Sequence, residues 1–139
     1  DKFQKVAVDL QISDRVKFMD LVPRAWIPTW MSAAEMLVLP SRAEGRPNVV
    51  LEAMSCELPV VATHVGGTKE LISHESTGLL FDPGDADKLC KYMSRILEDQ
   101  NTSRRLAAGA KQSLSDQGLT WRLHGDKLAK YYSLYGKKK

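Results

Sequence analysis

Short apolar runs alternate along the chain with longer stretches of helical periodicity, and this alternation restricts the fold more than any other feature of the sequence. Four runs have the length of strands and are rich in Val, Leu and Phe: Val16–Met19, Met36–Pro40, Pro59–Thr63 and Leu79–Asp82. Three of them lack polar residues at alternate positions, as is typical of strands covered by helices on both faces. The pattern predicts a Rossmann-like parallel sheet flanked by helices, an α/β fold.

Helical patterns precede, separate and follow the apolar runs. The chain is expected to open within a helix, because four apolar residues recur there at helical spacing: Phe3, Val6, Ala7 and Leu10. The further expected helical segments are Trp26–Ala34, Asn48–Cys56, Thr68–Ser73, Asp85–Asp99, Ser103–Asp116 and Trp121–Tyr135. Asp85 is expected to cap its helix, whose buried stripe would be Leu89, Tyr92, Met93, Ile96 and Leu97.

The size and composition fit one soluble domain. A length of 139 residues and a hydrophobic share of 43% are sufficient for a core. The net charge is only +3 and lies partly in Lys137–Lys139, so no nucleic-acid partner is expected. No apolar run approaches the roughly 20 residues of a membrane span, and no signal-peptide pattern opens the chain.

Neither a metal site nor a disulfide is predicted. Cys56 and Cys90 are not spaced as metal ligands, and both are expected to be buried thiols in a reducing compartment. The three histidines are scattered along the chain and receive no catalytic role. The three tryptophans occupy helical positions and are expected to belong to the core: Trp26, Trp30 and Trp121.

The loop Pro40–Asn48 follows a predicted strand, at the carboxyl end of the sheet where α/β domains bind ligands. It leads into a helix whose first backbone N–H groups are unpaired and positively polarised. Gly45 allows the backbone to approach a ligand closely, and Arg46 can bind a phosphate through two N–H groups. Pro47 is expected at the first helical position, where proline is tolerated.

A second loop, Thr63–Thr68, also joins a predicted strand to a predicted helix. It contains the adjacent glycines Gly66 and Gly67, and Thr68 is a candidate helix cap. Such a loop is suited to an anion, although the two glycines could also form no more than a tight turn.

Two glutamates frame the first loop. Glu44 precedes the helix, and Glu52 lies within it among apolar neighbours. Burying the charge of Glu52 without a partner is costly, and a ligand with two hydroxyls, such as a ribose, would offset that cost. Two other interpretations stay open. Glu44 could be an ordinary carboxylate at a helix N-terminus, and Glu52 could be satisfied by a backbone N–H or by Arg42.

The chain resembles the retaining glycosyltransferases of the GT-B fold, the group 1 family related to glycogen and sucrose synthases. The resemblance is strongest in Glu44–Thr63, which reads Glu-Gly-Arg-Pro-Asn-Val-Val-Leu-Glu-Ala-Met-Ser-Cys-Glu-Leu-Pro-Val-Val-Ala-Thr, and in the Val-Gly-Gly of residues 65–67. Residues 34–41, 77–80 and 83–85 match the family in its order and spacing, so the likeness covers most of residues 15–134.

The resemblance implies roles for individual residues. The second glutamate of the family's motif, here Glu52, binds the ribose of the donor nucleotide, and the first, here Glu44, lies against the donor sugar as the catalytic candidate. The loop after Met19 borders the nucleobase. Besides Glu52, the donor-binding residues implied are Gly45, Arg46, Pro47, Asn48, Val49, Gly66 and Gly67.

The chain also departs from the family. Asp20 and Glu57 stand where glycine is common, and Glu35 where aspartate is usual; Glu57 removes a favourable left-handed cap at a helix end. The family's basic pair for the leaving diphosphate and its acceptor-binding domain are missing. We therefore expect residues 1–139 to be one partial C-terminal nucleotide-sugar-binding domain lacking its first strands, with 121–139 forming a C-terminal helix and basic tail.

The implied activity is transfer of a sugar from a nucleoside-diphosphate donor to a glycan or lipid-linked acceptor, with retention at the anomeric carbon and without a metal or other cofactor. The parent enzyme is expected to be cytoplasmic, and peripheral to the inner membrane face if its acceptor is a lipid. The isolated chain is expected to be inactive and to self-associate, because missing strands leave sheet edges exposed. The alternatives are a nucleotide-sugar epimerase or a phosphorylase of the same architecture, and a non-catalytic nucleotide-binding or interaction module.

Overall fold

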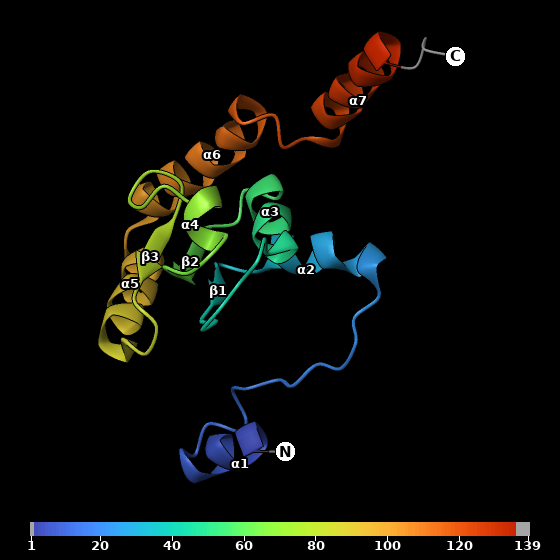
Figure 1. Cartoon of the computed structure of the whole chain (residues 1–139). Helices are drawn as coiled ribbons and strands as arrows, with labels where there is room; N and C mark the ends of the chain where they lie inside the picture. Colours follow the sequence, from blue (N-terminus) through green and yellow to red (C-terminus); the bar gives the residue numbers. More distant parts are fainter. Residues whose placement is uncertain (1, 136–139) are drawn as a thin grey trace.

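Three parallel strands lie at the centre of the molecule, and helices connect them (Figure 1). The computed structural model describes residues 2–135, except the side chain of Trp121. The elements are α1 (Lys2–Asp9), the 3-10 turn η1 (Arg24–Trp26), α2 (Ile27–Ala33), β1 (Leu37–Leu39), α3 (Asn48–Ser55), β2 (Val60–Thr63), α4 (Thr68–Leu71), β3 (Leu79–Phe81), α5 (Ala86–Glu98), α6 (Gln100–Asp116) and α7 (Trp121–Tyr135). The predicted tail, Lys137–Lys139, lies outside the described residues.

The sheet has the strand order β1-β2-β3. Val61 in the middle strand lies opposite Val38 of β1 on one side and Leu79 of β3 on the other. Every residue of β2 is buried. Parallel neighbours require crossover connections, and α3 and α4 provide them here.

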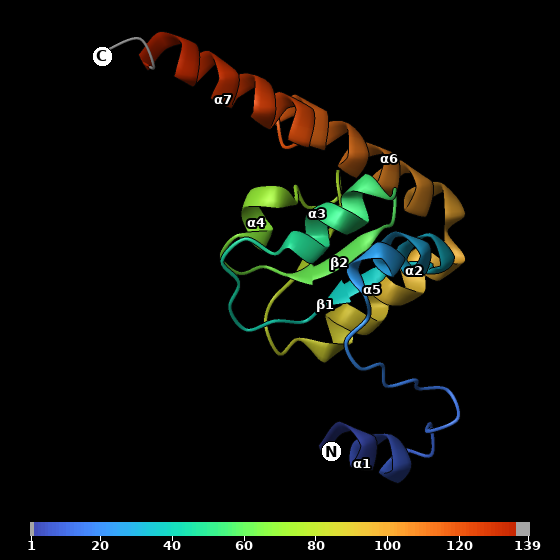
Figure 2. The same cartoon turned by 90° about the vertical axis from the view of Figure 1, so that its right-hand side faces the viewer.

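The two faces of the sheet pack on different helices, as Figure 2 shows with α3 and α4 on one side and α5 on the other. Because successive side chains of a strand point in opposite directions, Val60 and Ala62 join the cluster with α3, α4 and α6, whereas Val61 packs on the other face. The cluster on this second face consists of Val61, Leu79, Phe81, Tyr92, Ile96 and Leu106. The expected covering of both faces is confirmed.

The helices agree with the predicted segments to within a few residues. Asp85 caps α5 as expected, through a side-chain hydrogen bond from a backbone N–H of its first turn. α6 begins at Gln100 rather than Ser103, because Asp99 ends α5 and also accepts hydrogen bonds from two N–H groups of the next helix, each 3.0 Å long. Leu97 is 57% exposed, so its assignment to the buried stripe of α5 is wrong.

The predicted strand Val16–Met19 is wrong. These residues pair with no strand in the part of the chain that the structure describes, and Phe18 and Leu21 are 44% and 97% exposed. A strand needs a hydrogen-bonded neighbour, and its apolar composition alone does not supply one. β1 is therefore an edge strand here, and its residues are only half-buried.

Four predictions of buried side chains are also corrected. Trp26, at the end of η1, and Trp30, on α2, are 60% and 47% exposed, because both border a hollow beside residues 18–23 instead of packing into the core. Cys56 is half-buried and Cys90 is exposed, and both are free thiols. Helical spacing predicted the element in each case, but it could not tell which face is covered.

α1 and α7 lie apart from the sheet at the two ends of the chain (Figures 1 and 2). Of the stripe expected to be buried in α1, only Ala7 is buried. α7 presents exposed aromatic residues, and the rings of Tyr131 and Tyr135 stack with their centroids 6.1 Å apart. Between residues 2 and 135, no helix combines the length and the apolar composition that crossing a membrane requires.

Candidate functional site

The two loops predicted to bind anions lie side by side at the carboxyl ends of β1 and β2 (Figure 2). Residues 40–47 join β1 to α3, and residues 64–67 join β2 to α4. The backbone N–H of Gly67 donates to the carbonyl oxygen of Glu44 at 3.1 Å. Parallel strands end at the same edge of a sheet, so the fold brings both loops to the place where such domains bind ligands.

Gly66 and Gly67 form the surface on which the first loop rests. Gly66 has a φ of +36°, and a Cβ on it would lie 1.9 Å from the carbonyl oxygen of Glu44. A Cβ on Gly67 would lie 1.7 Å from the carbonyl oxygen of Gly45. Only glycine fits at such separations. The space beside these two glycines is thus filled by the first loop, and their direct contact with a donor stays a prediction.

The side chain of Glu44 is half-buried and takes a hydrogen bond from its own loop. Ser41 Oγ donates to Glu44 Oε1 at 2.6 Å. The second carboxylate oxygen of Glu44 has no hydrogen-bond or ion-pair partner among residues 2–135. Because a carboxylate can accept about four hydrogen bonds, most of the accepting capacity of Glu44 is available to a ligand.

The side chain of Glu52 has no protein partner within the described residues. It is half-buried on α3, between the fully buried Val50 and Ala53 and their neighbours. Neither a backbone N–H nor Arg42 pairs with its carboxylate there, so the structural interpretation of this glutamate finds no support. A half-buried carboxylate without a partner is the group that gains most from a ligand hydroxyl.

No side chain caps the first turn of α3. Pro47 stands at the cap position, one residue before the position predicted, and its ring leaves no N–H. In the first backbone hydrogen bond of the turn, the Val50 N–H donates to the Pro47 carbonyl oxygen at 3.1 Å. In the described structure the N–H groups of Asn48 and Val49 have no partner, so they are open to an anion.

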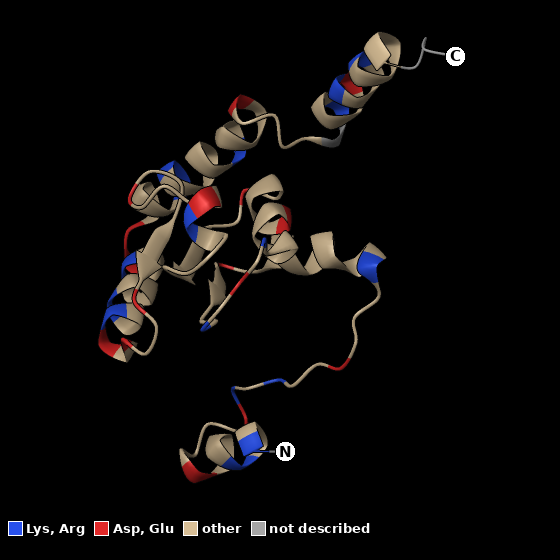
Figure 3. Cartoon of the chain, in the orientation of Figure 1, with Lys and Arg blue, Asp and Glu red and all other residues tan. Residues whose placement is uncertain are grey.

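Charges of both signs lie along the loop that leads into α3 (Figure 3). Arg42 and Arg46 are exposed, and neither forms an ion pair among the described residues. Arg46 directly precedes Pro47, the cap residue of α3. Its positive guanidinium and the open N–H groups of the helix start both attract an anion.

Two threonines hold this end of the sheet, and the sequence predicted neither role. Thr63, 1% exposed at the end of β2, donates from Oγ1 to the Ser41 carbonyl oxygen at 2.6 Å. Thr68 is the sequence's candidate cap for α4, but Gly67 holds the cap position, and Thr68 Oγ1 lies within hydrogen-bonding distance of the carbonyl oxygens of Val65 and Thr63. The sequence signal that could have indicated the role of Thr63 is its position as the hydroxyl residue that ends the otherwise apolar strand β2.

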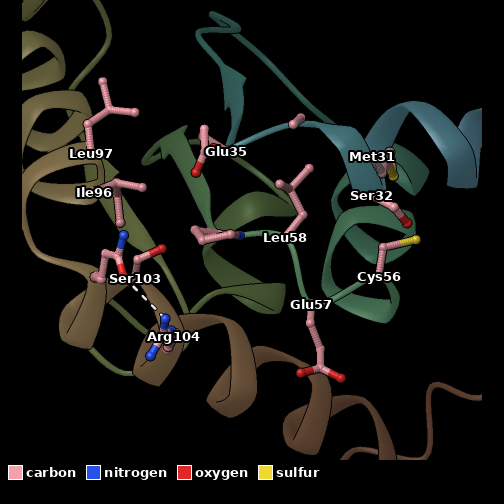
Figure 4. A pocket seen from close by; sticks show the side chains of 13 residues that line it. Met31, Ser32, Glu35, Cys56, Glu57, Leu58, Ile96, Leu97, Ser103 and Arg104 are labelled. Atoms are coloured by element: carbon pink, nitrogen blue, oxygen red, sulfur yellow. Dashed lines mark hydrogen bonds between the residues drawn. The ribbon is translucent and has the colours of Figure 1, made fainter.

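A cavity of about 300 Å³ lies at the opposite end of the sheet (Figure 4). Glu35 and Leu58 line it just before β1 and β2 begin, and Arg104 lines it from α6. A second hollow of about 420 Å³ includes Met19 and Asp20, in the segment expected to border a nucleobase. Neither hollow is lined by Glu44, Glu52 or the predicted donor-binding residues.

The carboxylates with perturbed pKa values lie away from the two loops. Arg95 donates to Glu75 Oε1 at 2.6 Å, and this hydrogen bond lowers the pKa of Glu75. Hydrogen bonds from Thr102 likewise lower the pKa of Asp99. Glu75 binds Arg95 of α5 and Asp99 caps α6, so both carboxylates have local structural partners. Among the described residues no group of three or more His, Cys, Asp or Glu could hold a metal ion.

An α/β domain with an uncapped helix start and a close glycine contact at the carboxyl ends of parallel strands has the features of a nucleotide-binding domain. The family described as "Glycosyl transferases group 1" matches residues 1–113. The chain belongs to this family, and the resemblance found in the sequence is confirmed.

Relatives of known description agree with the family. The D-inositol 3-phosphate glycosyltransferase of Frankia alni is 38% identical over 110 residues, which are 79% of this chain and 27% of that protein. The alpha-D-kanosaminyltransferase of Streptomyces kanamyceticus is 34% identical over 113 residues, 77% of this chain and 29% of that protein. The chain therefore spans less than a third of the length of these two relatives.

Solved structures confirm the fold. The sucrose-phosphate synthase of Thermosynechococcus elongatus matches 97% of the chain with a TM-score of 0.87 and 29% identity, over 34% of its own length. Anabaena HepE, solved in complex with UDP-glucose, matches 83% of the chain with a TM-score of 0.78 and 32% identity, over 31% of its length. The C-terminal domain of LpcC from Francisella tularensis shares the fold, with a TM-score of 0.75 over 83% of the chain.

Proposed function

We propose that the chain is the donor-binding part of a glycosyltransferase that uses a UDP-sugar. The observation that carries this proposal is the uncapped start of α3, placed between Glu44 before it and the unpaired Glu52 within it. Sequence similarity supports the choice of nucleotide, because Anabaena HepE, 32% identical, was solved with UDP and with UDP-glucose.

The roles proposed for the residues follow from their chemistry. Glu52 accepts hydrogen bonds from the ribose hydroxyls, which would relieve its unpaired, half-buried charge. The N–H groups of Asn48 and Val49 bind the diphosphate together with Arg46. Glu44 lies against the donor sugar, with one carboxylate oxygen fixed by Ser41 and the other free to accept from it.

The proposed reaction is transfer of a hexose to a glycan or lipid-linked acceptor with retention at the anomeric carbon. Negative charge grows on the leaving diphosphate as the glycosidic bond breaks, and the proposal assigns its stabilisation to the uncapped start of α3 and to Arg46. The acceptor and its activation are proposed to involve parts of the parent protein outside this chain. The isolated chain would then bind the donor without transferring its sugar, and the proposal includes no metal.

Isothermal titration calorimetry tests the proposal directly. The wild-type chain is expected to bind UDP and UDP-glucose, and Glu52→Gln is expected to weaken UDP binding roughly 10- to 100-fold through loss of hydrogen bonds to a charged group. Glu98→Gln removes the same charge at an exposed position of α5 and serves as the control. Equal affinity of Glu52→Gln and wild type for UDP would remove the ribose assignment.

Product analysis separates this function from its rivals. Incubation of the full-length parent with UDP-glucose is expected to give a new glycoside only when an acceptor is added. A sugar epimerised without any acceptor would support the epimerase alternative instead.

A further inference from the structure

We propose that Ser41 and Thr63 are positioning residues that aim the carboxylate of Glu44 at the donor sugar. This inference rests on the proposed function, which assigns Glu44 to that sugar. Ser41 lies in the loop that follows β1, and Thr63 is the last residue of β2. The sequence placed the two residues in the two loops predicted to bind anions, but it gave neither an individual role in the site.

A chain of hydrogen bonds leads from the sheet to the carboxylate. Thr63 is 1% exposed, and its Oγ1 lies 2.6 Å from the Ser41 carbonyl oxygen and 3.3 Å from the Leu39 carbonyl oxygen. Its single hydroxyl proton therefore serves Ser41, the nearer acceptor. Ser41 Oγ in turn donates to Glu44 Oε1 at 2.6 Å.

The backbone of Glu44 is fixed from a different direction. The Gly67 N–H holds its carbonyl oxygen at 3.1 Å, and Gly66 packs directly beneath it. These contacts hold the main chain of the loop but leave the long glutamate side chain free to rotate. The hydrogen bond from Ser41 is thus the only one among the described residues that orients the carboxylate.

In this arrangement, the residue proposed to contact the sugar and the groups proposed to bind the nucleotide belong to different elements. Glu44 lies on a loop attached to β1, β2 and α4, whereas Glu52 and the open N–H groups belong to α3. Loss of the Ser41 hydroxyl would free the carboxylate of Glu44 and reduce its preorganisation for the sugar. The contacts proposed for UDP itself would be unchanged.

Titration of the 139-residue chain with UDP and with UDP-glucose tests the inference. Ser41→Ala is expected to weaken UDP-glucose binding by about three- to tenfold while UDP binding stays within about twofold of wild type. Thr63→Val is expected to act in the same direction, and Thr63→Ser, which keeps the hydroxyl, to retain the wild-type ratio of the two affinities. Ser32→Ala, an exposed serine of α2, is the control.

A double-mutant cycle with Glu44→Ala shows whether Ser41 acts through Glu44. In the Glu44→Ala background, Ser41→Ala is expected to have no further effect on UDP-glucose binding. An unchanged affinity ratio in Ser41→Ala, or an equal loss in both backgrounds, would overturn this inference alone. Failure of the wild type to bind either ligand would overturn the proposed function and this inference with it. Thermal unfolding of each variant reports whether its fold is intact.

Discussion

Replacing Gly67 with alanine tests the contact between the two loops most severely. The new Cβ would lie 1.7 Å from the carbonyl oxygen of Gly45, 2.7 Å from its carbonyl carbon and 3.0 Å from the Cα of Arg46. An ordinary contact begins near 3.4 Å, so the shortest separation would have to double. All three atoms belong to the backbone, which cannot turn aside as a flexible side chain does, so the loop that carries Glu44 must move.

The size of the effect follows from two terms. Overpacking a close contact destabilises by about 1–3 kcal/mol. Loss of the 3.1 Å hydrogen bond between Gly67 and Glu44 adds about 1 kcal/mol. At roughly 3 °C per kcal/mol for a domain of this size, Gly67→Ala should lower the melting temperature by roughly 6–12 °C. Displacement of Glu44 by more than an ångström should also weaken UDP-glucose binding by at least about tenfold.

Thermal unfolding followed by circular dichroism, together with titration of UDP-glucose, measures both effects. Gly45→Ala is the control for the melting temperature alone, since a Cβ there meets no atom within 4 Å and should leave that temperature within about 1 °C of wild type. The reasoning is refuted if Gly67→Ala melts within about 2 °C of wild type and binds UDP-glucose equally well.

Three further predictions concern stability and association. Glu57 lies just beyond the C-cap of α3 and has a φ of +54°, so Glu57→Gly should relieve left-handed strain and raise the free energy of unfolding in urea by roughly 0.5–1 kcal/mol, after loss of its exposed ion pair with Lys111. A lower urea midpoint would contradict this. The Arg95 hydrogen bond lowers the pKa of Glu75 from 4.5, so its contribution is complete above that pH and is lost as the pH falls through the lowered pKa. The melting temperature of Glu75→Gln should therefore fall less than that of the wild type between neutral and strongly acidic pH. An equal fall would count against the ion pair of Glu75 and Arg95. The exposed apolar residues of α1, α2 and α7 should make the isolated chain self-associate, and light scattering that shows a monomer at several hundred micromolar would argue against it.

Local features of the fold were predictable because their causes lie within a few residues of one another. The strand that ends at Thr63 and the cap at Asp85 are where periodicity and capping chemistry place them, and the helix after Pro47 begins within one residue of the predicted position. The predicted strand Val16–Met19 and the expected burial of Trp26 failed for a common reason, because both required a neighbour that sequence spacing cannot supply.

The sequence by itself determined the family and the two acidic residues of the candidate site, because the motif from Glu44 to Glu52 is contiguous and its residue types define its chemistry. Only the tertiary structure decided how that motif is held. The hydrogen bond from Thr63 to Ser41 joins residues 22 positions apart, and it exists because β1 and β2 pair in parallel and end together. The same pairing places Gly66 and Gly67 under the loop of Glu44, a contact that depends on distances across the sheet edge rather than on spacing along the chain.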